Sequence, residues 1–208
     1  MNILFQGDSI TDCLRDTADP ADLGQGYARI AAGLLRAGHP GIPLTFRNLG
    51  VAGSQTADLL ARIETDVVQV QPDLVSLLIG INDVWHYAAD RRWLPQDVFE
   101  GQYRAVLETI RTRTHAKLVV LEPYLLPLPR KAFFREDLDP KIQIIRRLAL
   151  AYADVFVPTD GLMTAALLGR PQDAFSEDGV HLNDAGAQVL ARIYADWVGP
   201  VIEAMAQS

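Results

Sequence analysis

The sequence predicts an α/β protein: a flavodoxin-like, three-layer α/β/α sandwich built on a five-stranded parallel sheet. Five short apolar runs beside turn residues indicate strands, and longer stretches with helical spacing lie between them. This alternation requires crossover connections, which place helices on both faces of a parallel sheet. A chain of 208 residues, 49% of them hydrophobic and 22% charged, has the length and composition of one globular domain spanning residues 1–208.

The elements follow in order along the chain. We expect strands at residues 3–5, 44–47, 74–79, 118–121 and 155–157, with helices at 27–37, 56–70, 96–113 and 141–153. Ser54 can cap the second of these helices, Asp139 and Pro140 can start the fourth, and Asn183 can cap a last helix that runs towards Pro200. Residues 122–137 contain several prolines and two phenylalanines, which predicts a long loop, and loops of that length are often functional.

Composition and charge exclude several classes of partner and location. The net charge of −7 repels phosphate backbones and anionic lipid, so we expect neither a nucleic-acid nor a membrane partner. A single cysteine, Cys13, excludes an intrachain disulfide and a multi-cysteine zinc site. The first six residues lack the basic region and apolar run of a signal peptide, and no apolar run is long enough to span a membrane, so we expect a cytoplasmic protein.

Motifs for metals and nucleotides are missing. No HExxH spacing is present, and Gly24-Gln25-Gly26 lacks the third glycine of a dinucleotide fingerprint. No glycine-rich loop ends in Gly-Lys-Ser or Gly-Lys-Thr. We therefore expect no metal and no cofactor.

Polar residues follow the first three predicted strands. Ligands bind at the carboxyl ends of parallel strands, where residues 7–11, 48–53 and 80–83 are expected to meet. Ser9, at a strand-to-helix turn, would present its hydroxyl at the sheet edge and its backbone N–H at a helix N-terminus, which suits a nucleophile. The alternative is that Asp8, Ser9 or Thr11 only caps the following helix.

A carboxylate and an imidazole lie three residues apart near the other end of the chain. A serine hydroxyl needs a base to take its proton, and a carboxylate can orient that base; His181 and Asp178 can supply these roles for Ser9. Considered without Ser9, the segment favours the simpler interpretation, an exposed turn before a capped helix, and the pairing with Ser9 is what favours catalysis. We expect the other three histidines to be structural or solvated: His39, His86 and His115.

An ester hydrolase also needs donors that face the oxyanion of its tetrahedral intermediate. The Gly53 N–H and the Asn82 amide can provide them, although a turn glycine and a loop-capping asparagine are simpler interpretations of each residue alone. Cys13 is a poor alternative nucleophile, because it lies about one helical turn beyond Ser9.

Four ordered blocks resemble the SGNH, or GDSL-like, hydrolases, a family named for a serine, a glycine, an asparagine and a histidine. The blocks are Gly7-Asp8-Ser9-Ile10-Thr11, residues 48–53, Gly80-Ile81-Asn82-Asp83 and Asp178-Gly179-Val180-His181-Leu182. The resemblance implies the SGNH hydrolase fold, with Ser9 as nucleophile, His181 as general base and Asp178 as its partner. It also implies an oxyanion hole formed by Ser9, Gly53 and Asn82. Ile10 stands where leucine is usual, and Thr11 distinguishes the block from the G-x-S-x-G elbow of α/β-hydrolases.

Within that family, residues 23–27 and 80–85 look like the subgroup of acetyl-xylooligosaccharide esterases. This implies a metal-free serine esterase that removes acetyl groups from sugars, with Trp85 stacking on the sugar or closing a small acyl pocket. One alternative is a lipase, acyl-thioesterase or arylesterase with a groove formed by Leu125, Leu126, Leu128, Phe133 and Phe134, although those residues can equally cover the sheet. The other is a noncatalytic carbohydrate-binding protein. The sequence is compatible with a homo-oligomer and does not specify the number of subunits.

Overall fold

The computed structural model describes residues 1–19 and 21–207. All five predicted strands form and pair in parallel in one sheet of order β2-β1-β3-β4-β5. Their bounds are β1 (Asn2–Gly7), β2 (Thr45–Asn48), β3 (Leu74–Leu78), β4 (Lys117–Leu121) and β5 (Val155–Val157). The predicted α/β class and five-stranded parallel sheet are confirmed.

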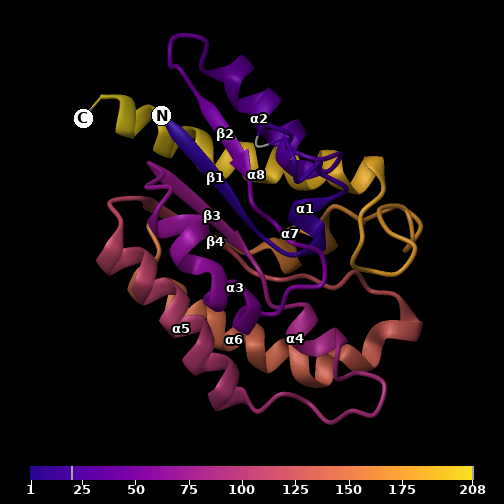
Figure 1. Cartoon of the computed structure of the whole chain (residues 1–208). Helices are drawn as coiled ribbons and strands as arrows, with labels where there is room; N and C mark the ends of the chain where they lie inside the picture. The colour runs from indigo at the N-terminus through magenta and orange to yellow at the C-terminus, as the bar shows by residue number, and fades with distance from the viewer. Residues whose placement is uncertain (20, 208) are drawn as a thin grey trace.

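Helices cover both faces of the sheet (Figure 1). On one face α2 (Tyr27–Gly38) packs against α8 (Asp184–Ala206), and on the other α5 (Gln96–Arg113) packs between α3 (Thr56–Ile63) and α6 (Arg135–Tyr152). Alternate strand residues point to opposite layers, so Phe5 lies in the core under α2 and α8 whereas Leu4 lies in the core under α3 and α5. Burial on both faces explains the nearly continuous apolar strands.

Short helices follow the ends of β1, β3 and β5: α1 (Ser9–Asp12), α4 (Asn82–Trp85) and α7 (Thr159–Ala165). A π-helical turn η1 (Glu64–Val68) continues α3, and a 3₁₀ helix η2 (Pro129–Phe134) leads into α6. The sequence predicts a helix after β1, but α1 is only one turn long because Cys13 adopts a left-handed backbone conformation with φ 40°.

Contrary to the expectation from the sequence, Ser54 does not cap the second predicted helix. Gln55 is the N-cap of α3 and forms a capping box with Asp58. The Ser54 hydroxyl accepts a hydrogen bond from Arg62 instead. The predicted helix 56–70 divides into α3 and η1, and the latter ends at Val68.

The fourth predicted helix begins earlier than expected. Helix α6 starts at Arg135, so Pro140 lies inside it and the predicted loop 122–137 is irregular only as far as Leu128. Pro140 cannot donate to the Glu136 carbonyl, but both residues are exposed and water can hydrate that carbonyl. The added turns bury Leu138 and an ion pair between Lys141 and Asp137 of 2.5 Å, which favours the longer helix.

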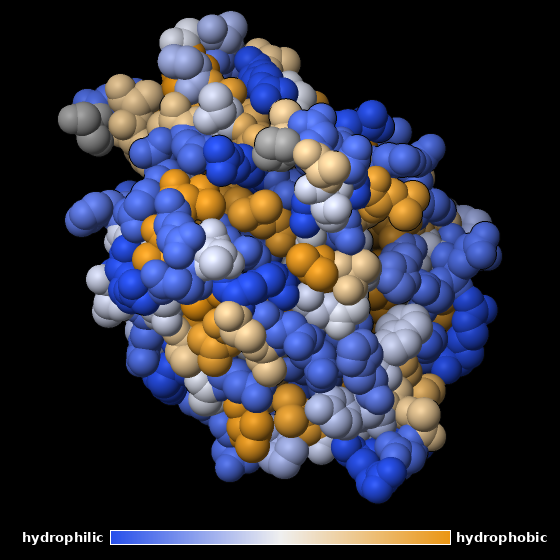
Figure 2. Space-filling view, viewed as in Figure 1, coloured by the Kyte–Doolittle hydropathy of each residue, from blue (hydrophilic) through white to orange (hydrophobic). Residues whose placement is uncertain are grey.

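The last helix also extends further than predicted. Asn183 caps α8 as expected, by accepting a hydrogen bond from the Gly186 N–H, and the helix continues through Pro200 to Ala206. Among residues 1–19 and 21–207, no helix has both the length and the apolar character needed to cross a membrane. The face of the molecule in Figure 2 is mainly hydrophilic, with apolar residues scattered in small groups.

The strand order determines where a site can form. Strand β1 lies between β2 and β3, and the register pairs Gly7 with Leu78 and Phe5 with Asn48. The chain leaves β1 towards one side of the sheet and β3 towards the other, so the carboxyl ends of these strands border a topological switch point. The three segments with polar residues all begin there.

Candidate active site

Ser9 is the first residue of α1, and Asp8 alone separates it from the end of β1. Asp8 caps this turn, because its Oδ1 accepts a hydrogen bond of 3.0 Å from the Ile10 N–H. The Asp8 carbonyl accepts from the N–H groups of Thr11 and Asp12. The Ser9 N–H has no acceptor among residues 1–19 and 21–207, which leaves it available to a ligand.

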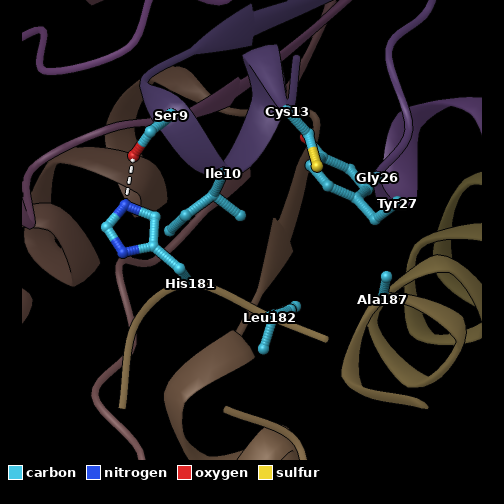
Figure 3. A pocket seen from close by; sticks show the side chains of 8 residues that line it. All are labelled: Ser9, Ile10, Cys13, Gly26, Tyr27, His181, Leu182 and Ala187. Atoms are coloured by element: carbon cyan, nitrogen blue, oxygen red, sulfur yellow. Dashed lines mark hydrogen bonds between the residues drawn. The ribbon is translucent and has the colours of Figure 1, made fainter. Parts of the chain in front are cut away.

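Ser9, His181 and Asp178 form one chain of hydrogen bonds. The Ser9 Oγ lies 2.9 Å from His181 Nε2, and His181 Nδ1 lies 2.7 Å from Asp178 Oδ2 (the first contact is drawn in Figure 3). When Nδ1 donates its proton to Asp178, Nε2 is left to accept the Ser9 proton. The structure therefore brings together three side chains that come from the two ends of the sequence.

The turn that holds Asp178 and His181 is well supported. The Asp178 Oδ1 accepts from the N–H groups of Val180 (2.9 Å) and His181 (2.8 Å), which fixes the carboxylate against its own loop. Gly179 has a φ of +88°, and a Cβ there would lie 3.2 Å from the Leu126 carbonyl oxygen. Glycine thus allows the turn to pack on the segment after β4.

Electrostatics at the site favour a base that is easily protonated. The hydrogen bond to Asp178 and the charge of that carboxylate raise the pKa of His181, although burial opposes this. Burial raises the pKa of Asp178, but the hydrogen bonds from His181 and Val180 outweigh it and hold that pKa below its ordinary value. Asp8 differs, because burial raises its pKa to about 7.

Gly53 and Asn82 lie at the same edge of the sheet. Gly53 has a φ of +79°, and its N–H makes no hydrogen bond within the part of the chain that the structure describes. Asn82, buried at the start of α4, donates one amide hydrogen to the Ser54 carbonyl at 3.0 Å. An amide has two hydrogens, so the second is available to an oxyanion.

Arg62 and Asp83 hold these segments together, and neither role was predicted from the sequence. The Arg62 guanidinium donates to the Ser54 hydroxyl (2.9 Å) and the Gly7 carbonyl (3.3 Å) and pairs with Asp66 (3.0 Å). Asp83 accepts from both the N–H and the hydroxyl of Thr56, at 3.0 Å each. No local pattern marks Arg62, since its contacts depend on how α3 packs beside β1 and β3. The sequence identified Asp83 only as the last residue of the block Gly80-Ile81-Asn82-Asp83, with no role of its own.

A small cavity lies beside Ser9 and His181 (Figure 3). Its volume is about 50 Å³, and it is lined by Ser9, Ile10, Cys13, Gly26, Tyr27, His181, Leu182 and Ala187. This is room for a group of only a few heavy atoms. Cys13 lies on its wall, where burial raises the pKa of the thiol and disfavours the nucleophilic thiolate.

Trp85 lies next to the imidazole. Its ring is 5.8 Å from the His181 ring at an interplanar angle of 66°, and one of its faces is covered by the Lys131 ammonium at 3.5 Å from the ring centroid. Of the other histidines, His39 bonds to the Leu35 carbonyl through Nδ1. Across residues 1–19 and 21–207, no group of three His, Cys, Asp or Glu side chains is arranged to hold a metal ion.

Comparison with known proteins identifies the family. Residues 5–189 match the GDSL-like lipase/acylhydrolase family. The chain belongs to this family and is a carboxylic ester hydrolase. It is 31% identical over 204 residues to an acetylxylan esterase of Geobacillus stearothermophilus, a match that covers 95% of this chain and 93% of that protein.

Solved structures of similar fold support the same family. The crystal structure of the acetylxylan esterase Axe2 from Geobacillus stearothermophilus superposes with a TM-score of 0.86 at 30% identity, covering 95% of this chain and 94% of that chain. An alpha/beta hydrolase enzyme from the metagenome of Lake Arreo, Spain, has a TM-score of 0.87 at 28% identity, with the same coverage. Catalytic mutants of Axe2 replace a serine, an aspartate and a histidine with alanine, and the last two are three residues apart, as Asp178 and His181 are here.

Proposed function

We propose that this GDSL-family hydrolase is a serine esterase that works through an acyl-enzyme, with Ser9 as nucleophile, His181 as general base and Asp178 as its orienting partner. The observation that carries the proposal is the continuous hydrogen-bond chain from Ser9 Oγ to the Asp178 carboxylate. The catalytic Axe2 variants support it, because they replace the same three residue types with the same aspartate-to-histidine spacing. Residues 1–208 then form a single esterase domain.

In the first half of the reaction, Ser9 Oγ attacks the ester carbonyl carbon while His181 Nε2 takes the hydroxyl proton. The carbonyl oxygen becomes an oxyanion that accepts hydrogen bonds from the Ser9 N–H, the Gly53 N–H and the Asn82 amide. Collapse of the tetrahedral intermediate breaks the bond to the alcohol oxygen, which takes its proton from His181. The acyl group stays on Ser9, and the alcohol leaves.

In the second half, His181 takes a proton from water as the water attacks the acyl-enzyme, and a second tetrahedral intermediate forms in the same oxyanion hole. Its collapse releases the carboxylic acid and returns the proton to Ser9. Asp178 stabilises the imidazolium in both halves without itself becoming protonated. The low pKa of Asp178 keeps it ionised for this role.

The acyl group that the site favours is acetyl, and the alcohol is a sugar or xylo-oligosaccharide. The 50 Å³ cavity beside Ser9 suits a group of a few heavy atoms, and the acetylxylan esterase of Geobacillus stearothermophilus is 31% identical over nearly the whole chain. Trp85 adjoins His181, but Lys131 already covers one of its faces, so only the remainder of the ring could contact a sugar.

The esterase with a long-chain substrate is the second candidate. Four of the residues considered for a lipid groove are 6% exposed or less, which leaves little apolar surface on them for an acyl chain: Leu125, Leu126, Leu128 and Phe134. The three leucines do border a depression of about 200 Å³, but neither Ser9 nor His181 lines it. The short acyl group is therefore the better supported choice. Membership of a hydrolase family disfavours the noncatalytic binding protein.

The test is release of acetate from acetylated xylo-oligosaccharide by wild type and Ser9→Ala at pH 7.5, with an octanoyl ester as the long-chain comparison. We expect acetate release by wild type, its loss in Ser9→Ala and slow octanoate release. Rapid hydrolysis of the octanoyl ester without acetate release would support the long-chain alternative. Equal rates for wild type and Ser9→Ala would rule out Ser9 as nucleophile.

A further inference from the structure

Lys131 lies one aromatic ring away from the imidazole of His181. Its ammonium is 3.5 Å from the centroid of the Trp85 ring and 4.5 Å from that of Phe134. The Trp85 ring in turn meets the His181 ring edge to face at 5.8 Å. Attraction between a cation and two ring faces holds the ammonium at this place.

The ammonium has no anionic partner of its own. Two cations of the surrounding segments are paired, Arg91 with Glu136 at 3.2 Å and Arg135 with Asp160 at 2.7 Å, whereas the adjacent Arg130 is exposed. Lys131 makes neither an ion pair nor a side-chain hydrogen bond to any residue within 1–19 and 21–207. The charges that act on it are those of Asp178, Arg130 and His181. Asp178 is already bonded to His181, so the three N–H donors of Lys131 are left without a protein acceptor.

The segment that presents Lys131 is the one that supports the Asp178–His181 turn. Tyr124 donates its hydroxyl proton to the Val180 carbonyl at 2.8 Å, and the Leu126 N–H donates to the Gly179 carbonyl at 2.9 Å. Helix η2 follows within three residues and contains Lys131. These contacts fix the segment that leads into η2 against the Asp178–His181 turn, and the rings of Trp85 and Phe134 hold the ammonium beside it.

The proposed reaction determines which part of the substrate lies on this side. His181 must deliver its proton to the leaving alcohol oxygen, so the alcohol portion of the ester lies next to the imidazole. The small cavity assigned to the acyl group also borders His181, but neither Trp85 nor Lys131 lines it. Because Trp85 adjoins the imidazole outside that cavity and carries Lys131 on its face, these two side chains meet the alcohol portion.

We propose that Lys131 is a specificity residue whose ammonium donates a hydrogen bond to a hydroxyl or ring oxygen on the sugar that forms the alcohol portion of the ester. This rests on the proposed function and extends it to a defined subsite. Lys131 is partly exposed, so water hydrates its ammonium in the free enzyme, and a sugar oxygen can take the place of that water in a charge-assisted hydrogen bond. An alcohol portion that presents no such oxygen gains nothing from Lys131.

The test compares Lys131→Met with wild type on two acetyl esters, acetylated xylo-oligosaccharide and phenyl acetate, at a pH where both enzymes have reached their plateau rates. Methionine removes the charge and keeps an apolar stem over Trp85. Because a hydrogen bond from a charged donor is worth about 1.5–3 kcal/mol, kcat/KM for the sugar ester should fall about 10-fold or more, mainly through KM. For phenyl acetate it should change less than about 2-fold. Arg130→Met, which removes the adjacent exposed cation, is the matched control and should change neither.

Other outcomes separate the inference from the proposed function. Equal losses on both esters, or no loss on the sugar ester, would overturn the role of Lys131 while the esterase assignment stands. Wild type that hydrolyses phenyl acetate but not the sugar ester would overturn the sugar substrate and this subsite with it. Loss of the Lys131 cation also raises the pKa of His181, so the fall of kcat/KM at acidic pH moves to higher pH with both esters. That common shift differs from the substrate-selective loss that the subsite predicts.

Discussion

Replacing Asp8 with asparagine should change how the stability of the fold depends on pH. The carboxyl of Asp8 is 1% exposed; its Oδ1 accepts from the Ile10 N–H, while its Oδ2 has no hydrogen-bond partner in the described chain. Burial, aided by the nearby charge of Asp83, raises its pKa from 3.8 to about 7, against the opposing effects of the Ile10 bond and of His181. Asparagine keeps the acceptor for Ile10 and cannot ionise.

The magnitude follows from that pKa. The shift corresponds to about 4 kcal/mol between the neutral and ionised carboxyl. Because the folded-state pKa lies above the unfolded-state value, the stability that neutral Asp8 provides is fully present below the unfolded-state pKa and is lost as pH rises through about 7. Between pH 5.5 and 8 the free energy of unfolding of wild type should therefore fall by about 2 kcal/mol relative to that of Asp8→Asn.

Urea unfolding followed by circular dichroism at both pH values measures this difference, provided that the m-values of the two proteins agree. Asp196→Asn, which replaces an exposed carboxylate on α8, controls for the loss of one negative charge. If wild type and Asp8→Asn lose or gain stability in parallel from pH 5.5 to 8, Asp8 is not a buried neutral carboxyl and the reasoning is refuted.

Three further predictions concern activity. His181 must be neutral to act as base, so kcat/KM of wild type should fall at acidic pH with a midpoint above 6.5, and a flat profile from pH 5 to 8 would contradict this role. Asp178→Asn should lower kcat on the order of 10³-fold and move the acidic fall of its residual activity to lower pH. Asn82→Ala should lower kcat on the order of 10²-fold, and an unchanged kcat would remove Asn82 from the oxyanion hole. The contacts of Arg62 use three different nitrogens, whose positions the single nitrogen of lysine cannot reproduce, so Arg62→Lys should lower kcat about 10-fold with little change in KM. Arg104→Lys, in an i,i+4 pair away from the site, is its control, and equal effects of the two substitutions would show that Arg62 does not position the oxyanion donors.

Much of the fold was predictable because strand periodicity and helix spacing are local signals. The strand at Val155–Val157 and the helix at Gln96–Arg113 match the expected bounds, since both have an apolar pattern with clear ends. The start of α6 was wrong because Asp139-Pro140 resembles a helix start, whereas burial of Leu138 and of the Asp137–Lys141 pair favours an earlier one. That burial depends on packing and leaves no trace in the local pattern.

In the candidate site too, local sequence signals identified some residues, whereas residues that depend on packing were missed. Ser9, His181 and Asp178 could be proposed because their residue types fit one reaction and their blocks follow strand ends, and the structure places them within hydrogen-bond distance. Lys131 could not be proposed from the sequence, because its proposed role depends on one side-chain contact with Trp85 that forms only when η2 lies against α4. The sequence showed a proline-rich segment there and no sign of a cation beside the base.

The most direct measurement of the central claim locates the acyl group on the enzyme. Wild type and Ser9→Ala are mixed with 4-nitrophenyl acetate, quenched in acid and analysed by intact mass and peptide mapping. The account predicts one acetyl group on the peptide that contains Ser9, and neither that group nor rapid turnover in Ser9→Ala. An acetyl group on Cys13, or turnover by Ser9→Ala at the wild-type rate, would contradict it.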